Sequence, residues 1–409
     1  MTLAEIQTLD RTDPLAPKRA EFLLPEGVIY LDGNSLGALP KRVVARMERV
    51  VQAEWGQSLI KSWNLHGWID LPQRVGAKIA RLVGAQPDEV VVTDSTSINL
   101  FKVLLAALKL RPGRRVILSD VANFPTDLYI AQGIAHLLEG YGLRLLPKEE
   151  LEAGLDEEVA VLLLTEVDYR SGYRFDMKGL TRLAHQKGAL CIWDLAHSAG
   201  AFPVHLNQAQ ADFAVGCGYK YLNGGPGAPA FLFVARPHQK ATRPFLTGWM
   251  GHAQPFAFSP EYLPAEDLRR LTVGTPPILS MSALDEALEV FEGVDMHLVR
   301  QKSLRLSDLF ISLMEPLAAR YGFQLVTPRE HDRRGSQVAY RHPEGYAIMQ
   351  ALIAQGVVGD FRAPDVLRFG FAPLYLRFED VYQAVQRLAQ VMQSGLWREA
   401  RFQERAQVT

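Results

Sequence analysis

The amino-acid sequence predicts an α/β protein with a mostly parallel β-sheet, followed by a smaller α+β domain at its C-terminal end. Through the middle of the chain, short apolar runs alternate with helical patterns, which is typical of parallel sheets. Beyond about residue 295, strands and helices follow one another more closely, which indicates a second kind of domain. The 409 residues are enough for two domains, and 48% hydrophobic against 22% charged residues allows a large buried core.

The parallel sheet is predicted from apolar runs of strand length. They span residues 90–93, 116–119, 161–166, 190–194, 213–216 and 230–234. Between the third and fourth runs lies a helix that Asp176 can cap, whose apolar side chains share one face and which Gly188 can end. Because the next strand follows directly, this segment predicts a βαβ unit.

The C-terminal part of the chain is predicted to begin with a long helix over residues 296–321, after an apolar-periodic helix within 274–293. Strands are then expected at 338–341, 357–361 and 366–371, and a final helix near 381–393. No repeat, low-complexity segment or Gly/Ser-rich linker divides the chain. We therefore expect a large domain over residues 51–295, a small domain over 296–409, and an N-terminal segment, residues 1–50, that joins the small domain.

The composition argues against several classes of partner. Forty-four basic and 45 acidic residues give a formal net charge of −1, so no overall attraction to nucleic acid or to an anionic membrane is expected. The first 17 residues are polar, unlike a secretory signal, and no apolar run approaches the ~20 residues that span a bilayer. Two cysteines, Cys191 and Cys217, provide neither a disulfide framework nor a multi-cysteine metal site. We expect a cytoplasmic protein without a bound metal.

The first chemically informative group closes the predicted strand 190–194. Asp194 lies at the carboxyl end of this strand, where open α/β sheets bind their ligands, and His197 follows three residues later. Taken alone, Asp194 is more readily explained as a helix cap, and His197 equally well as a packed loop histidine.

The second group follows the next strand. Lys220 comes just after residues 213–216 and before a glycine-rich loop at residues 224–227. A lysine amine in a partly desolvated pocket has a lowered pKa and is a competent Schiff-base nucleophile, and glycines let the backbone approach a planar ligand. An isolated lysine would instead be assigned to a surface turn.

Together, Asp194 and Lys220 on successive parallel strands are what pyridoxal 5′-phosphate (PLP) requires. The carboxylate keeps the pyridine nitrogen protonated, so that the ring accepts electrons, and the lysine tethers the cofactor. A phosphate site is predicted at Thr96 and Ser97, which open a helix after a strand and offer hydroxyl and backbone N–H donors. No nucleotide-binding glycine motif is present.

At this point the chain resembles a known family. Its blocks are similar to those of PLP-dependent enzymes of fold type I, in the class V aminotransferase branch, and more closely to the kynureninase family. The resemblance runs from about Tyr30 to Tyr375. The motifs that carry it are Leu-Asp-Gly-Asn-Ser-Leu-Gly at 31–37, Phe-Pro-Thr-Asp at 124–127, Trp-Asp-Leu-Ala-His at 193–197, Gly-Tyr-Lys-Tyr-Leu-Asn at 218–223, Gly-Trp-Met-Gly-His at 248–252 and Pro-Pro-Ile-Leu at 276–279.

The resemblance implies a fold type I large domain with a mostly parallel seven-stranded sheet and a set of site residues. Lys220, Asp194 and Tyr219 would be catalytic, and Arg368, Ser35 and Trp63 would bind substrate. The cofactor would be held by Thr96, Ser97, Phe124, Asp127, Thr165, Asp194, His197, Tyr219, Lys220, Trp249 and Thr275. Trp249 and Thr275 would reach the phosphate from the other subunit, so a homodimer with its active site at the interface is implied.

The implied activity is PLP-dependent hydrolysis of L-kynurenine to anthranilate and L-alanine in tryptophan catabolism, with 3-hydroxykynurenine left open as a substrate. A cysteine desulfurase or selenocysteine lyase is one alternative, but it needs a cysteine on a mobile loop, and Cys191 and Cys217 fall on strands. A PLP-binding regulator without catalysis is another, and it predicts loss of the Asp194 and Lys220 pair.

Three positions leave alternatives open. Thr275 stands where relatives can carry Asn, and its hydroxyl has a shorter reach. Residues 55–68 match relatives poorly, so Trp63 and His66 can equally be aromatic side chains of an amphipathic loop or helix. Arg368 lies in a strand-like apolar run, where a guanidinium needs an anionic partner. That partner is either the substrate carboxylate or a structural acid such as Asp360 or Asp365.

Overall fold

The computed structural model describes residues 2–405, and its large sheet has seven strands in the order β4-β10-β9-β8-β7-β5-β6. Strands β9, β8, β7, β5 and β6 run parallel, whereas β10 is antiparallel to both β4 and β9, so the mostly parallel sheet is confirmed. The strands are β4 (Val90–Val92), β5 (Val116–Asp120), β6 (Gly142–Leu146), β7 (Val159–Thr165), β8 (Leu190–Asp194), β9 (Phe213–Gly216) and β10 (Phe231–Val234). The sequence pattern did not predict β6, because this edge strand is only partly buried and carries no continuous apolar run.

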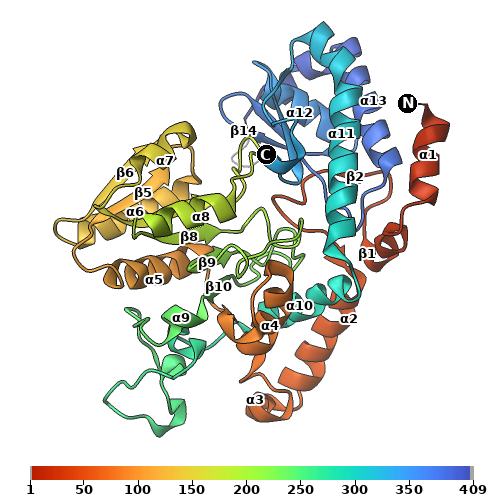
Figure 1. The fold of residues 1–409 in the computed structure, drawn as a ribbon. Coiled ribbons are helices and arrows are strands. Elements are labelled where there is room, and N and C mark those ends of the chain that lie inside the picture. The colour runs from red at the N-terminus through yellow and green to blue at the C-terminus, as the bar shows by residue number, and fades with distance from the viewer. Residues whose placement is uncertain (1, 406–409) are drawn as a thin grey trace.

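Helices cover both faces of this sheet (Figure 1). On one face, α5 and α6 bury apolar side chains against alternate strand residues such as Val161 and Leu163. On the other face, α4, α8 and α10 pack on the neighbouring residues, such as Leu162 and Leu164. These helices are α4 (Leu71–Val83), α5 (Thr96–Lys109), α6 (Pro125–Leu137), α8 (Met177–Gln186) and α10 (Ile278–Ala287), with the short α7 (Leu151–Gly154) and α9 (Arg236–Gln239) between strands.

The βαβ unit around α8 has the predicted cap. The Asp176 carboxylate accepts a hydrogen bond from the Gly179 backbone N–H at 3.0 Å. Gly188 has a φ of 82°, in the left-handed region that glycine adopts easily. The chain therefore turns directly into β8, which ends at Asp194 as predicted.

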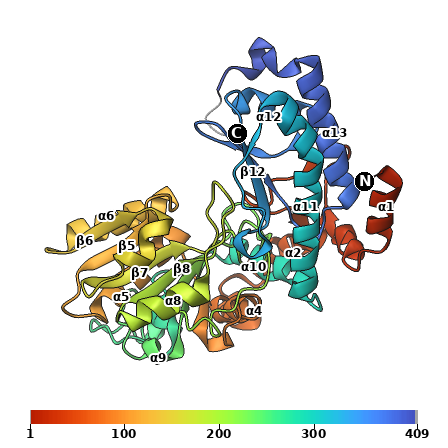
Figure 2. The same cartoon turned by 45° about the horizontal axis from the view of Figure 1, so that its top comes forward.

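The C-terminal part forms a second, antiparallel sheet in the order β11-β12-β15-β14, beside the long helix α11 and the helix α13 (Figures 1 and 2). Its elements are α11 (Met296–Tyr321), β11 (Gln324–Leu325), β12 (Gln337–Arg341), α12 (Gly345–Ala354), β13 (Val357–Val358), β14 (Asp360–Arg362), β15 (Val366–Gly370) and α13 (Phe378–Ser394). The strand predicted at 357–361 is split at Gly359, where an added Cβ would lie 2.8 Å from the Arg368 carbonyl oxygen. The break sends β13 and β14 into different sheets.

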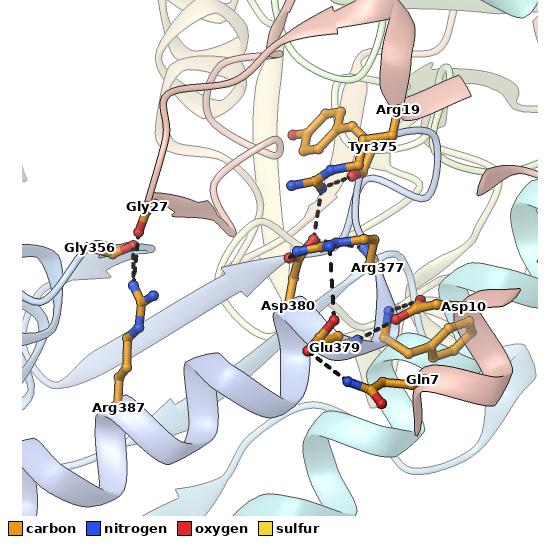
Figure 3. Close-up of polar contacts among 11 residues, drawn as sticks. Gln7, Asp10, Arg19, Gly27, Gly356, Tyr375, Arg377, Glu379, Asp380 and Arg387 are labelled. Atoms are coloured by element: carbon orange, nitrogen blue, oxygen red, sulfur yellow. Dashed lines mark hydrogen bonds and ion pairs between the residues drawn. The ribbon is translucent and has the colours of Figure 1, made fainter. Parts of the chain in front are cut away.

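The N-terminal segment reaches this second sheet and its helices. Strand β2 (Ile29–Tyr30) pairs with β13, and the Asp10 carboxylate of α1 (Leu3–Arg11) accepts hydrogen bonds from the first backbone N–H groups of α13. Figure 3 shows Arg19 reaching Asp380 and the Tyr375 carbonyl in the same region. The other N-terminal elements are β1 (Phe22–Leu23), β3 (Leu39–Pro40), α2 (Lys41–Arg49) and α3 (Ser62–Leu65), and α2 packs against α10. The domain limits near residues 50 and 295 stay a prediction.

Within residues 2–405, no helix combines the length and the apolar composition needed to cross a bilayer.

Candidate active site

The candidate site lies at the carboxyl edge of the large sheet, where β7 and β8 end and the chain leaves β9. Thr165 and Asp194, the last residues of β7 and β8, are register partners, and both are buried. Lys220 follows β9 by four residues and reaches the same edge. The parallel register thus brings together three residues that are far apart in the sequence.

Lys220 lies in a closely packed turn. Its Nζ is 3.4 Å from Nε2 of His197 and 5.9 Å from the centre of the Phe124 ring. The backbone N–H of Gly37 donates to the Tyr219 carbonyl at 2.8 Å, and a Cβ at Gly37 would lie 2.2 Å from the Lys220 carbonyl oxygen. Only glycine permits this approach, which explains the last residue of the motif at 31–37.

Asp194 is paired with a second buried acid, Asp127, at the start of α6. The two carboxyl groups interact directly, and burial raises the pKa of both, with the charge of Asp194 raising the pKa of Asp127 further. The backbone N–H of Ala196 donates to Asp194 Oδ1 at 2.8 Å, and the positive charge of Lys220 lowers the pKa of Asp194. This arrangement favours an ionised Asp194 beside a protonated Asp127.

His197 is buried beside Lys220, and burial together with the positive charge of Lys220 holds its pKa well below the usual range. The backbone of Asn34 lies beside the ring and raises this pKa, but burial outweighs it. His197 is therefore a neutral, fixed ring at neutral pH rather than a cation.

Phe124 closes the site from the α6 side. Its ring is 37% exposed and meets the Tyr169 ring edge-on, with 5.2 Å between ring centres. Asn123 fixes the turn before α6, because its side-chain oxygen accepts a hydrogen bond from the Phe124 N–H at 2.7 Å. An exposed aromatic face held this way can stack on a planar ring.

A cavity of about 410 Å³ opens at the N-terminus of α5. Its lining residues include four that carry hydroxyl groups, Ser95, Thr96, Tyr219 and Thr275, and Asp94, whose carboxylate is paired with Lys102 at 2.5 Å. The Ser95 hydroxyl caps α5 by accepting a hydrogen bond from the Ile98 N–H. The N-terminal end of the helix, with its free backbone N–H groups, is therefore the end at which the cavity lies. Such a helix start is an anion site. Thr275, which was expected to reach the phosphate from the other subunit, lines this cavity in the same chain as Thr96.

Arg368 lies on β15 and is buried with Asp360 of β14, its register partner. Its Nε donates to Asp360 Oδ1 at 2.7 Å, its Nη2 donates to Asp360 Oδ2 and, at 3.2 Å, to the Ser35 hydroxyl, and its Nη1 donates to the Tyr169 carbonyl. The structural acid left open by the sequence is therefore present, and it is Asp360 rather than Asp365.

Two predicted residues lie away from this group within one chain. Trp249 is 39% exposed and packs on the Phe256 and Phe258 rings of its own loop. Trp63 lies on α3, at the periphery of the molecule in Figure 1, with its ring 6.1 Å from that of Trp68. Any role of these two side chains at Lys220 would require a second subunit.

The two cysteines are buried, and burial raises the pKa of both thiols. Cys191 lies inside β8, and the Cys217 thiol faces the Ala196 carbonyl at 3.8 Å. Neither is the accessible thiolate that a desulfurase needs.

Three residues at the site escaped the sequence analysis as individual candidates: Asn34, Tyr169 and Asp360. Asn34 belongs to the motif at 31–37, so the sequence pointed to this position but not to a function for its side chain. Tyr169 acts through its backbone carbonyl, which no side-chain pattern reports. Asp360 was considered only as a structural partner of Arg368.

Comparisons with known proteins identify the family. A model described as the kynureninase C-terminal domain matches residues 299–388. The chain is 57% identical to a kynureninase of Deinococcus radiodurans over 397 residues, covering 96% of this chain and 97% of that protein. It is 54% identical to a kynureninase of Burkholderia mallei over 414 residues, covering both chains in full.

Solved structures with low sequence identity share the fold. A cysteine desulfurase from Thermococcus onnurineus has a TM-score of 0.77 at 19% identity, covering 92% of this chain and 98% of its own. The cysteine desulfurase CsdA of Escherichia coli has a TM-score of 0.74 at 22% identity, covering 93% and 98%. The fold is that of these enzymes, while the full-length relatives above decide the family: the chain is a member of the kynureninase family.

Proposed function

We propose that this chain binds PLP through Lys220 and hydrolyses L-kynurenine to anthranilate and L-alanine. The observation that carries the proposal is the constellation around Lys220, in which Asp194, His197 and Phe124 surround one amine at the carboxyl edge of the sheet. Family membership at 54–57% identity over 96–100% of the chain supports the same activity.

The residues present fit PLP. Within the described part of the chain, Oδ2 of the buried Asp127 has no hydrogen-bond partner, as expected if the acid pair faces a bound group. The hydroxyl-lined cavity at the start of α5 suits a phosphate dianion. We assign the phosphate to Thr96, Ser97, Tyr219 and Thr275, the ring face to Phe124 and His197, and the ring nitrogen to Asp194 with Thr165 and Asp127 nearby.

When bound, PLP supplies an electron sink for negative charge at the substrate Cα. Asp194 would contribute the negative charge that keeps the pyridine nitrogen of the cofactor protonated. The neutral His197 ring and the Phe124 ring would contact the face of the cofactor ring without adding charge. Lys220, once free of its tether, has the reach to accept and return a proton at Cα.

Substrate orientation is assigned to the opposite wall of the site. We assign the α-carboxylate to Arg368, whose Nη1 keeps one N–H beyond its bond to the Tyr169 carbonyl, and to Ser35, whose hydroxyl is 3.2 Å from Nη2. We also assign Tyr219 to proton transfer, because it adjoins Lys220 in the chain and lines the cavity at the start of α5 with a neutral hydroxyl. Trp63 is assigned to the pocket for the aromatic ring.

A homodimer completes this proposal. Trp249 and Trp63 lie on segments that are rich in exposed apolar side chains, including Leu59, Ile60 and Phe258. Exposed apolar patches of this kind mark interfaces. We infer that the two segments meet the partner subunit and that each active site takes residues from both chains.

Fluorescence of released anthranilate tests the function directly. Purified protein with added PLP should release anthranilate from L-kynurenine, and L-alanine should appear in equal amount. Release of sulfide from L-cysteine with no anthranilate from L-kynurenine would instead support a desulfurase.

A further inference from the structure

Asn34 is a buried side chain whose amide is unused. It lies in the connection between β2 and β3 and is completely buried. Among the described residues, neither its Nδ2 nor its Oδ1 has a hydrogen-bond partner. Because an unpaired buried amide is unfavourable, one with both halves unpaired indicates a missing ligand.

The Asn34 amide lies between the two halves of the candidate site. An added Cβ at Gly370 would be 1.9 Å from Asn34 Oδ1, and Gly370 is two residues from Arg368 on β15. Side chains two apart on a strand emerge on the same face, so the amide is on the Arg368 side of the strand. On its other flank, the Asn34 backbone lies beside the His197 ring.

Arg368 by itself is an incomplete carboxylate site. Asp360 accepts from its Nε and Nη2, which is the edge that usually holds a carboxylate through two bonds. Tyr169 takes one donor of Nη1. The second N–H of Nη2 points at the Ser35 hydroxyl at 3.2 Å. The guanidinium therefore retains one free N–H, on Nη1, and a substrate carboxylate needs a further donor for its second oxygen.

We propose that Asn34 is this donor: its Nδ2 binds one oxygen of the substrate α-carboxylate while the free N–H on Nη1 of Arg368 binds the other. The inference rests on the proposed function and adds a substrate-binding residue to it. A neutral amide suits the position electrostatically. The surrounding cluster already contains two acids, Asp32 and Asp360, against the guanidiniums of Arg362 and Arg368.

Two variants alter the amide in different ways. Asn34→Ala removes it, whereas Gly370→Ala keeps it but pushes it aside, because the new Cβ would overlap Oδ1. Dissociation constants are measured spectroscopically on the PLP-loaded protein for L-alanine and for ethylamine, which keeps the amine but lacks the carboxylate. We expect L-alanine to bind about 10- to 100-fold more weakly to both variants, with ethylamine unchanged.

Controls separate this role from a structural one. Asn207→Ala removes an amide bonded to Glu89, outside the site, and should leave both dissociation constants at the wild-type value. Thermal midpoints and PLP affinity report any general damage. Unchanged L-alanine binding, or equal weakening for L-alanine and ethylamine, would overturn the proposal.

The test stands apart from the proposed function. If the wild-type protein fails to release anthranilate from L-kynurenine, the proposed function is wrong, while the comparison of L-alanine with ethylamine still decides whether Asn34 binds a carboxylate. If wild-type activity is present, the KM for L-kynurenine should rise in both variants. Should Asn34→Ala fail to fold, Gly370→Ala decides the question.

Discussion

Arg368 and Asp360 face each other across the antiparallel pair β14 and β15, with the guanidinium Nε 2.7 Å from Oδ1 of Asp360. Asp360 also accepts hydrogen bonds from Ser35 at 2.7 Å and from Arg362 at 2.9 Å. The buried Asp360 carboxylate thus holds the orientation of the arginine that is assigned to the substrate carboxylate. Its two expected roles, structural partner and substrate clamp, involve different nitrogens of one guanidinium.

Replacing Arg368 by Lys should affect both roles. A compact ammonium cannot form the planar two-bond pair with Asp360 and also reach the substrate carboxylate from a separate nitrogen, so kcat/KM per folded molecule should fall roughly 100-fold or more. The thermal midpoint should also fall, because Asp360 loses a two-bond partner. Arg362→Lys is the matched control, since it changes another partner of Asp360 and should leave kcat/KM near wild type. Loss of stability with unchanged kcat/KM would remove Arg368 from substrate binding.

Replacing Lys220 by Ala should abolish turnover and the absorbance of the lysine-bound cofactor. The geometry gives the reason, since its Nζ is the amine beside both His197 and Phe124. Borohydride reduction of the wild-type protein, followed by peptide mapping, should place the cofactor on the peptide that contains Lys220. Lys178→Ala, an exposed position on α8, serves as control. Label on a different lysine would refute the assignment.

Replacing Asp194 by Asn should lower kcat by about 1,000-fold while PLP affinity changes far less, because the variant keeps size but removes charge. Asp127→Asn should cost much less. Burial and the neighbouring Asp194 raise the pKa of Asp127, so an amide resembles its protonated form. Steady-state kinetics and PLP titration of both variants check this order. Near-normal turnover in Asp194→Asn would mean that another group carries the charge.

Subunit mixing should reveal which chain Trp249 serves. Lys220→Ala and Trp249→Ala proteins are each expected to have low activity. If Trp249 acts on the partner's site, equal mixing should restore about a quarter of wild-type activity, because half of the dimers are mixed and each has one complete site. Sedimentation should show dimers throughout. An absence of rescue, or a monomer with a complete phosphate site, would contradict the shared site.

The buried Asp212 predicts a pH-dependent contribution to stability far from the site. His185 and His238 bind its carboxylate through their Nε2 atoms at 2.8 and 2.7 Å. The hydrogen bond to Asp212 raises the pKa of His185 above 6.5. Its stabilisation is therefore complete below the unfolded-state pKa of about 6.5 and is lost as pH rises through the higher folded-state pKa.

Thermal midpoints of the wild type and His185→Gln should accordingly differ most below pH 6.5 and converge at alkaline pH. The difference between the two proteins cancels other groups that titrate in this range, such as Asp32, whose pKa is raised to about 7 by burial and by the charge of Asp360. Activity per folded molecule should be unchanged. A difference that is independent of pH would show that His185 contributes by packing alone.

The sequence by itself determined the local elements and the cofactor chemistry. Hydrophobic runs predicted six strands of the large sheet, and the ends of β8 and β9 were placed at the right residues because buried strands in a parallel sheet have sharp apolar limits. Strand β6 was missed because it is half exposed at the edge of the sheet. Asp194 and Lys220 were identified because their spacing relative to two strands is itself a local pattern.

Only the tertiary structure decided which groups meet. Two contacts depend on the folded structure: Asp127 meets Asp194, and Asp360 binds the guanidinium of Arg368. The burial of the Asn34 amide without a partner also results from segments that are distant in the chain. No periodicity encodes such contacts, since they depend on strand register and on how closely glycines let loops approach. For the same reason the role of Trp249, whose ring packs only on Phe256 and Phe258 among the described aromatic side chains, is left to the assembly of two subunits.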